Sequence, residues 1–294
     1  MTALKWTRKT TEKIAAELRN AGIAVCANTV ARLLDKLGYA LRTNEKTIAR
    51  CSPVDRDTQF QRIAELRQRF AARGWPVLSI DTKKKEQVAL FKNAGAEWAL
   101  ERRRVLDHDF PSDAKGVAIP YGIYLPLANV GMVYVGTSHD TPEFAVDCLV
   151  AWWEMDGQRR FPATDHILIL ADGGGSNGSR CRAWKYFLQH RLCDVHRLTV
   201  TVAHYPTGAS KWNPIEHRLF SEISKNWRGV PLESYETILN FIGTTTTATG
   251  LRVQSTLVNR TYNTGIRITN KQMASLSIEY DPSLPRWNYT IRPH

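Results

Sequence analysis

Two aspartates stand at positions where carboxylates could hold a divalent metal ion. Asp81 ends the apolar run of residues 76–80, and Asp172 ends the apolar run of residues 166–171. Both runs are typical of short strands, and ligands bind at the carboxyl edge of strands in an α/β sheet. Neighbouring strands lie about 4.8 Å apart, so adjacent carboxylates there could share a cation. The cation would remove the repulsion that otherwise raises one pKa.

Glu216 is the third candidate. It lies in the first turn of a helix that we expect to begin at Asn213. At roughly 100° per residue it falls in line with Phe220, Ile223 and Trp227, in the middle of the apolar stripe of that helix. A carboxylate on a buried face needs a partner. A metal ion held by the two aspartates would be one.

Each carboxylate also has a structural explanation. Asp81 could cap a helix that starts at Thr82, and Asp172 could stand in a simple turn. Glu216 could belong to a capping box with Asn213. Taken alone, each of the first two explanations is at least as good as catalysis. The combination is more specific, because 90 residues separate the aspartates and 43 separate Asp172 from Glu216.

The elements that must position these side chains follow a strand-rich order. Five strands are predicted at residues 76–81, 116–124, 131–137, 166–172 and 198–204, with helices at 55–74, 142–155, 179–192 and from 213 onward. Three strands precede the helix at 142–155, and strands and helices alternate after it. This order predicts a mixed sheet with helices packed on it.

The N-terminal region predicts two short helices, over residues 11–21 and 27–37, with a turn at Gly22 between them. The pattern is that of a helix-turn-helix. Four polar side chains would face DNA from the second helix: Asn28, Thr29, Arg32 and Lys36. The alternative is an ordinary helical hairpin whose charges are merely solvated.

The charge of the chain favours an acidic partner. Its 294 residues contain 40 Lys and Arg against 28 Asp and Glu, which gives a net charge of +12 and a pI near 9.6. Residues 1–54 carry ten basic and four acidic side chains, a net of +6. Nucleic acid is the partner that this excess favours. Directly after the first aspartate, Lys83, Lys84 and Lys85 could contact the DNA backbone, or they could be a solvated charge run.

Composition also limits the class of protein. With 43% hydrophobic residues the chain can bury a sizeable core. No apolar run approaches the roughly 18 residues of a membrane span, and the polar, basic N-terminus has no secretory core. The five cysteines are odd in number and form no CxxC pair, which argues against a disulfide framework. We therefore expect a cytoplasmic protein without a membrane partner.

The layout of two strand-end aspartates and a helical glutamate is that of the ribonuclease-H-like nucleotidyl transferases. Residues 204–216 are similar to the third-carboxylate motif of mariner-type transposases. Longer blocks resemble the ISAzo-type transposases of bacterial insertion sequences; they lie at residues 79–86, 91–95, 107–110, 120–124, 135–141, 171–178, 210–213, 215–220 and 287–291. The resemblance extends from about Trp6 to Arg292.

This resemblance implies a fold and an activity. The expected fold is an α/β, ribonuclease-H-like mixed sheet of five strands with flanking helices, plus an N-terminal helix-turn-helix. The expected activity is that of a DDE-type DNA transposase, named for its Asp, Asp and Glu, which cleaves and joins strands at the ends of its element. Asp81, Asp172 and Glu216 would hold two Mg²⁺ ions, for which Mn²⁺ can substitute. The partners would be the terminal repeats and target DNA, with a homo-oligomer forming on DNA at the bacterial nucleoid.

Four regions are expected. They are a helix-turn-helix region at 1–45, a linker and helix at 46–74, a ribonuclease-H-like catalytic domain at 75–229 and a C-terminal extension at 230–294. Transposases of this kind usually carry further N-terminal sequence, so we expect end recognition to be incomplete here. Two alternatives stay open: a silent or truncated, transposase-derived DNA-binding protein, and a structure-specific nuclease on the same fold.

Overall fold

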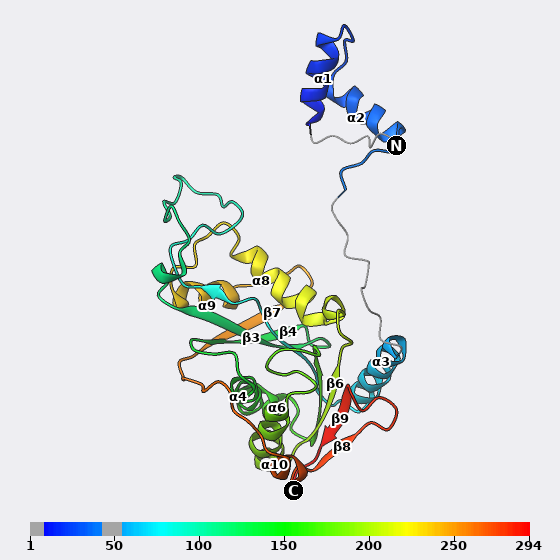
Figure 1. The fold of residues 1–294 in the computed structure, drawn as a ribbon, viewed down its shortest axis with the longest axis vertical. Helices are drawn as coiled ribbons and strands as arrows, with labels where there is room; N and C mark the ends of the chain where they lie inside the picture. The colour runs from blue at the N-terminus through cyan, green and yellow to red at the C-terminus, as the bar shows by residue number, and fades with distance from the viewer. Residues whose placement is uncertain (1–8, 43–54) are drawn as a thin grey trace. The chain divides into compact units, whose positions relative to one another are not determined.

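The computed structural model describes residues 9–42 and 55–294, and the chain divides into two compact units, residues 1–50 and 51–294 (Figure 1). The predicted linker before residue 55, and the predicted boundary at residues 45 and 46, lie outside the described residues. The two units are therefore considered separately.

The first unit contains the two predicted helices, α1 (Thr11–Asn20) and α2 (Ala27–Lys36). Thr10 caps the start of α1: its hydroxyl accepts a hydrogen bond from the Lys13 amide and so satisfies one of the free amides of the first turn. Ala15 and Val30 are the buried apolar residues of the pair. The helical pair is thus present, and its DNA-binding role stays a prediction.

The second unit is built on one mixed sheet of nine strands. Their order is β7-β4-β3-β1-β5-β6-β9-β8, with the short β2 paired to β3. The five predicted strands form its continuous middle: β4 (Val130–Gly136), β3 (Val117–Leu125), β1 (Val77–Thr82), β5 (His166–Ala171) and β6 (Thr199–His204). The predicted α/β class is confirmed, but the sheet has nine strands and not five.

The four additional strands are β2 (Glu86–Gln87), β7 (Arg252–Val258), β8 (Ile278–Tyr280) and β9 (Asn288–Ile291). Three of them have only two to four residues, too few for a repeating apolar pattern to be visible. The longer β7 lies parallel to β4. After β7, residues 259–269 form an irregular segment.

Strand register brings the two aspartates to equivalent positions. Strands β1 and β5 are parallel neighbours, and Ile80 pairs with Ala171. Asp81 and Asp172 come next in each chain segment. On its other side β1 runs antiparallel to β3, where Gly122 pairs with Asp81. The two strands are thus neighbours, which is the arrangement in which adjacent carboxylates could share a cation.

Helices cover both faces of the sheet (Figure 1). On one face, α4 (Pro142–Trp152) and α6 (Arg182–Phe187) pack against the buried side chains of Leu78, Ile80 and Ile169. On the other, α3 (Arg56–Ala72) covers Val77 and Leu168. Side chains alternate between faces along a strand, so Asp81 and Asp172 belong to the face that α3 covers.

The same face carries a second helical layer over β3, β4 and β7. It consists of the π-helical segment η5 (Glu216–Phe220), α8 (Ser221–Asn226) and α9 (Tyr235–Gly243). Leu219, Ile223 and Ile238 are fully buried there against Tyr124 and Val133. Glu216, at the start of this layer, is thus on the same face of the sheet as the two aspartates.

The remaining helical elements are short. They are η1 (Pro111–Asp113), η2 (Trp153–Gly157), α5 (Gln158–Arg160), η3 (Leu188–Cys193), α7 (Asp194–His196), η4 (Ser210–Trp212) and α10 (Asn270–Ala274). Among residues 9–42 and 55–294, no helix is both long and apolar enough to cross a membrane.

Candidate active site

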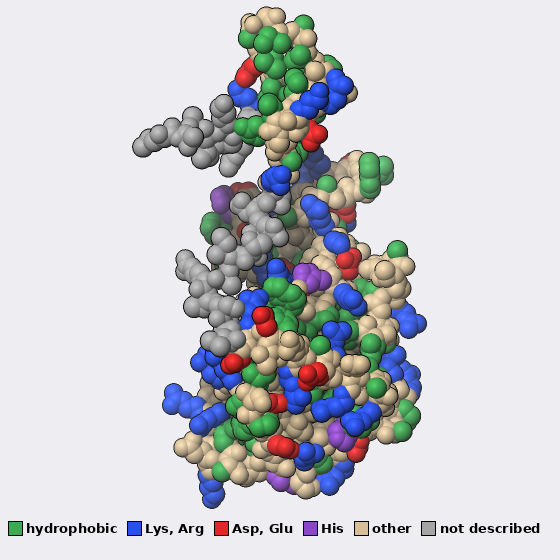
Figure 2. Space-filling view, turned by 90° about the vertical axis from the view of Figure 1, so that its right-hand side faces the viewer, with side chains coloured by type: hydrophobic (Ala, Val, Ile, Leu, Met, Phe, Trp, Pro, Cys, Tyr) green, Lys and Arg blue, Asp and Glu red, His purple; other side chains and the backbone are tan. Residues whose placement is uncertain are grey.

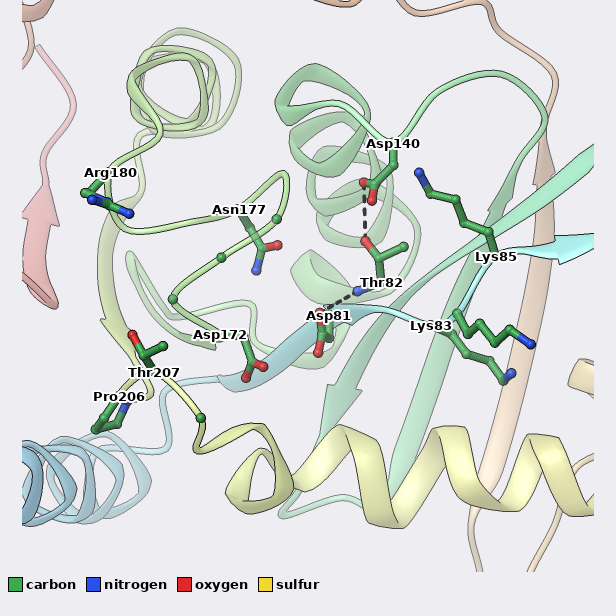
Figure 3. Close-up of a pocket in the computed structure, with 15 residues that line it drawn as sticks. Asp81, Thr82, Lys83, Lys85, Asp140, Asp172, Asn177, Arg180, Pro206 and Thr207 are labelled. Carbon is green, nitrogen blue, oxygen red and sulfur yellow. Dashed lines mark hydrogen bonds between the residues drawn. The ribbon is translucent and has the colours of Figure 1, made fainter. Parts of the chain in front are cut away.

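Asp81 and Asp172 line one open cleft of about 630 Å³ at the carboxyl edge of β1 and β5. In Figure 3 both carboxylates point into the same space. A helix cap at Asp81 and a simple turn at Asp172, the two structural explanations, do not by themselves account for these positions. No helix starts at Thr82, since residues 83–85 are irregular and β2 follows them. Asp172 does precede a glycine-rich turn, and its side chain lies in the cleft.

The glycine-rich loop after β5 forms the upper wall of the cleft in Figure 3. Gly173, Gly174 and Gly175 line it, together with the nearly buried Asn177. The loop is tightly folded: a Cβ on Gly178 would come within 3.2 Å of the backbone at three earlier glycines. At Gly178 the loop therefore has little room for a side chain, because the backbone of residues 173–175 passes close to it.

Glu216 approaches the two aspartates from the helical layer that packs on their face of the sheet. It is half-buried, and its carboxylate is close enough to raise the pKa of both Asp81 and Asp172. It is not one of the residues that line the cleft in this structure. No capping hydrogen bond from the Glu216 side chain is present in the part of the chain that the structure describes. The structure therefore agrees with the interpretation that Glu216 lies on the apolar stripe of its helix, and it shows no capping box at this residue among the described residues.

A buried network joins the helix of Glu216 to both aspartate strands. Asn213, fully buried, donates from its amide nitrogen to the Asp172 carboxylate at 3.2 Å and to the Ile80 carbonyl at 3.3 Å. The Ser79 hydroxyl donates to the Asn213 side-chain oxygen at 2.5 Å and accepts from the Ile215 amide at 3.1 Å. Ser79 of β1 thereby caps the helix that Asn213 was expected to cap.

A second buried contact supports Asp172 from behind. His204, fully buried at the end of β6, has its Nδ1 2.9 Å from the Asp172 carbonyl oxygen. Because a carbonyl can only accept, this nitrogen carries the proton. The other ring nitrogen faces the Tyr289 hydroxyl at 3.3 Å, which in turn accepts from Trp184 at 2.9 Å. Burial lowers the pKa of His204 to about 4, so the ring is neutral.

Burial and neighbouring negative charge raise the pKa of both Asp81 and Asp172. Burial, followed by the charge of Asp172, raises the pKa of Asp81 to about 8. Burial also raises the pKa of Asp172, and Glu216 adds to this, while the hydrogen bond from Asn213 opposes it. These are the shifts expected where carboxylates are gathered without a compensating charge.

The donors suit Mg²⁺ in type. This ion prefers oxygen ligands and is usually held by one or two carboxylates, with waters and substrate phosphates completing its shell. Asp81 and Asp172 supply two such carboxylates on adjacent strands. Within residues 9–42 and 55–294, no three Asp, Glu, His or Cys side chains form a ready metal cage. The two aspartates thus supply oxygen donors of the type that Mg²⁺ prefers.

The three lysines after Asp81 differ from one another. Lys83 is buried, pairs with Glu86 at 2.9 Å and has its ammonium 4.4 Å from the centre of the Trp227 ring. Lys83 also lines the cleft, but its ammonium already has partners inside the protein, so its role as a DNA contact stays a prediction. Lys84 and Lys85 are exposed and line the cleft.

The polar residues predicted on α2 belong to the first unit, and the carboxylates belong to the second. Asn28, Arg32 and Lys36 are exposed, as expected for the outer face of the helix. Thr29 is half-buried, with its hydroxyl 3.3 Å from the Cys26 sulfur. The structure does not bring these residues together with the carboxylates within one described unit.

Sequence reasoning missed several residues of the cleft. Asp140, which accepts a hydrogen bond from Thr82 at 3.3 Å, and Arg180 both line it. His204 and Ser79 lie behind it as supports. A polar residue inside an apolar strand, as Ser79 is in residues 77–80, was the one available signal, because such a residue needs a buried partner.

A sequence profile described as the Rhodopirellula transposase DDE domain matches residues 1–293. The chain belongs to this transposase family. No curated protein matches the chain. Among solved structures, the transposase chain is similar to the Mos1 transposase paired-end complex with left transposon end, with a TM-score of 0.50, 12% identity, and coverage of 80% of this chain and 65% of that one. It is also similar to a pre-cleavage Mos1 transpososome, with a TM-score of 0.49, 11% identity, and coverage of 80% and 66%.

At these identities the first Mos1 structure supports the fold alone. It confirms the predicted ribonuclease-H-like class for the transposase chain. The chain spans 65% of the length of that Mos1 chain. The predicted family is confirmed by the match over residues 1–293.

Proposed function

We propose that this chain is a Mg²⁺-dependent DNA transposase that cleaves and joins strands at the ends of an insertion sequence. The observation that carries the proposal is the pair of strand-end aspartates in one cleft, with Glu216 close enough to raise the pKa of both. Membership of the DDE transposase family supports it. Mos1, similar in fold, was solved as a complex with a transposon end.

In this proposal Asp81, Asp172 and Glu216 hold two Mg²⁺ ions. When bound, such ions activate a water or 3′-hydroxyl and stabilise the leaving oxygen during displacement at phosphorus. Because the pKa of Asp81 is raised to about 8, a metal ion would compete with a proton for this carboxylate. Asn213 occupies one oxygen of Asp172 and fixes its direction.

The protein side chains would bind and orient the DNA. Lys84 and Lys85 provide positive charge at the border of the acidic cleft, which would otherwise repel a phosphate. The small residues of the loop at 173–175 let a DNA backbone come close. On α2, Arg32 and Lys36 would bind DNA within a helix-turn-helix, and synapsis of two ends would require at least a dimer.

The decisive experiment is a cleavage and strand-transfer assay on the terminal repeats of the element, with Mg²⁺ or Mn²⁺. We expect Asp172→Asn to reduce cleavage by at least about 1,000-fold, since it removes a ligand charge without changing size. Asp113→Asn, which neutralises an exposed carboxylate outside the cleft, is the matched control and keeps normal activity. Normal cleavage by Asp172→Asn would exclude the proposed site. Cleavage of branched DNA without preference for the element ends would favour a structure-specific nuclease.

A further inference from the structure

A surface tryptophan near the cleft is flanked by two cations. Trp212, in η4, is 45% exposed. The guanidinium carbon of Arg56 lies 5.1 Å from the centre of its ring, and the Lys211 ammonium lies 4.3 Å from it. An exposed aromatic ring with two cations close to it combines the two features with which proteins bind nucleic-acid strands, a stacking surface and positive charge.

The cluster lies at the border of the catalytic cleft. The ring of Phe60, on α3, is 5.6 Å from the Trp212 ring and 6.3 Å from the Tyr205 ring. Tyr205 directly precedes Pro206 and Thr207, which line the cleft. Figure 3 shows these two residues on the opposite side of the aspartates from Lys83 and Lys85. Trp212 is also adjacent in sequence to Asn213, the hydrogen-bond donor to Asp172.

Arg56 and Lys211 have no carboxylate partner among residues 9–42 and 55–294, although Asp55 and Asp57 flank Arg56 and are exposed. Arg62, on the same helix, differs, because it pairs with Glu65 at 3.3 Å and with Asp281 at 2.8 Å. The charge of Arg56 and Lys211 is therefore available to an anionic partner.

We propose that Arg56, Lys211 and Trp212 form a second DNA-contacting edge of the cleft, opposite Lys84 and Lys85. The two cations bind phosphates of the strand that leaves the cleft on this side, and the Trp212 ring stacks on a base or sugar of that strand. The identity of the partner as DNA rests on the proposed function. Strand passage between two basic edges places the scissile phosphate over the carboxylates.

The test is equilibrium binding of the full chain to a fluorescein-labelled DNA duplex with a single-stranded extension, measured by anisotropy over a series of salt concentrations. No divalent ion is added, so cleavage does not contribute. The Arg56→Gln/Lys211→Gln variant should bind about tenfold more weakly, and the slope of log affinity against log salt should fall by about 2, at roughly 0.9 per phosphate contact. Trp212→Leu should weaken binding about fivefold with little change in slope, because it removes stacking and not charge.

Two controls separate this surface from general charge and from misfolding. Arg159→Gln/Arg160→Gln removes the same charge from arginines that already pair with Asp156, and should leave the slope unchanged. Trp212→Phe keeps an aromatic ring and should restore most of the affinity lost in Trp212→Leu. Thermal unfolding reports whether each variant folds.

The proposal is overturned if the Arg56/Lys211 variant keeps the wild-type slope, or if the Arg159/Arg160 control loses as much slope. It is also overturned if Trp212→Phe and Trp212→Leu bind equally. Failure of the proposed chemistry would look different: cleavage would persist in Asp172→Asn, whatever the binding assay shows.

Discussion

Asn213 is the residue on which the geometry of the carboxylates most depends. One buried amide reaches the Asp172 carboxylate, the backbone of β1 and the Ser79 hydroxyl. It stands three residues before Glu216. A change at this position therefore affects the strands and the helix together.

We predict that Asn213→Ala lowers the cleavage rate by about 100-fold and the free energy of unfolding by about 1–3 kcal/mol, since it leaves buried polar groups unpaired. Single-turnover cleavage and urea unfolding measure the two effects. Asn226→Ala is the matched control, because Asn226 lies at the end of α8 and donates to the Phe241 carbonyl, away from the cleft. An unchanged cleavage rate in Asn213→Ala would show that Asp172 does not need this hydrogen bond.

The pKa of Asp81 predicts an unusual pH dependence of stability. Its carboxyl holds a proton up to a pKa of about 8 in the folded state, against 3.8 for the ordinary group. Protons then bind more tightly to the folded state, so its contribution to stability falls as pH rises from about 4 to 8. Relative to Asp81→Asn, we expect the metal-free wild type to lose a few kcal/mol over this range.

Urea unfolding at pH 5 and pH 8, without metal, measures this difference. His204 contributes in the opposite sense, because its pKa is about 4 in the folded state against 6.5 for the ordinary group, so its contribution to stability is lost as the pH falls. This contribution cancels in the comparison, because both proteins contain His204. Added Mg²⁺ should restore the stability of the wild type at pH 8 and have little effect on Asp81→Asn. Parallel pH curves for the two proteins would contradict the prediction.

For single residues, the sequence predicted which side chains stand at the ends of strands better than it predicted which residues they contact. Asp81 and Asp172 could be found because each ends an apolar run, which is a local property. Asn213 was expected to cap a helix, and its actual partners, Ser79 and Asp172, are 134 and 41 residues away in sequence. Lys83 was expected at the surface, since the sequence cannot show that Trp227 would cover it.

Among the elements, β3 and η5 are in unusually close contact. Gly122 pairs with Asp81, and a Cβ there would come within 2.6 Å of the Phe220 ring and 2.8 Å of the Ile215 side chain. Because Gly122 has no side chain, the helix that carries Glu216 can lie directly against β3.

We predict that Gly122→Ala moves the start of this helix away from the sheet and reduces cleavage by about tenfold or more, with a loss of stability of about 1–3 kcal/mol from overpacking. Cleavage assays and urea unfolding test this. Adding Phe220→Leu and Ile215→Val, which shorten the two clashing side chains, should recover part of the activity. Gly122→Ala with full activity would mean that Glu216 needs no close approach of the helix.

The middle of the sheet was predictable and its edges were not. Residues 167–171 are continuously apolar because both faces of β5 are covered. In contrast, β8 has three residues and β9 has four, and their strand character comes from pairing with each other and with β6. This pairing joins segments that are far apart in sequence, so the local residue pattern of β8 or β9 cannot predict it.

For the whole molecule, positive charge is widely distributed. Figure 2 shows Lys and Arg side chains over much of the face of the second unit that it presents. With a net charge of +12, DNA affinity should fall steeply with salt. The α2 residues Arg32 and Lys36 are exposed and would add two phosphate contacts.

We predict that Arg32→Gln/Lys36→Gln weakens DNA binding by the full chain about tenfold and reduces the salt slope by about 2. Anisotropy with labelled duplex DNA measures both. Glu12→Gln/Glu17→Gln changes the charge of α1 in the opposite sense and should not weaken binding. An unchanged slope in the Arg32/Lys36 variant would favour the ordinary helical hairpin over the helix-turn-helix.

The pairing of β9 with β6 has a consequence for the newly made protein. Tyr289, in β9, faces His204, which holds the backbone of Asp172. During synthesis on the ribosome, β6 is made before β9, so His204 acquires the Tyr289 hydroxyl only after residues 288–291 have left the exit tunnel. If the carboxylates act as proposed, the support of Asp172 is completed after every residue that lines the cleft has been synthesised.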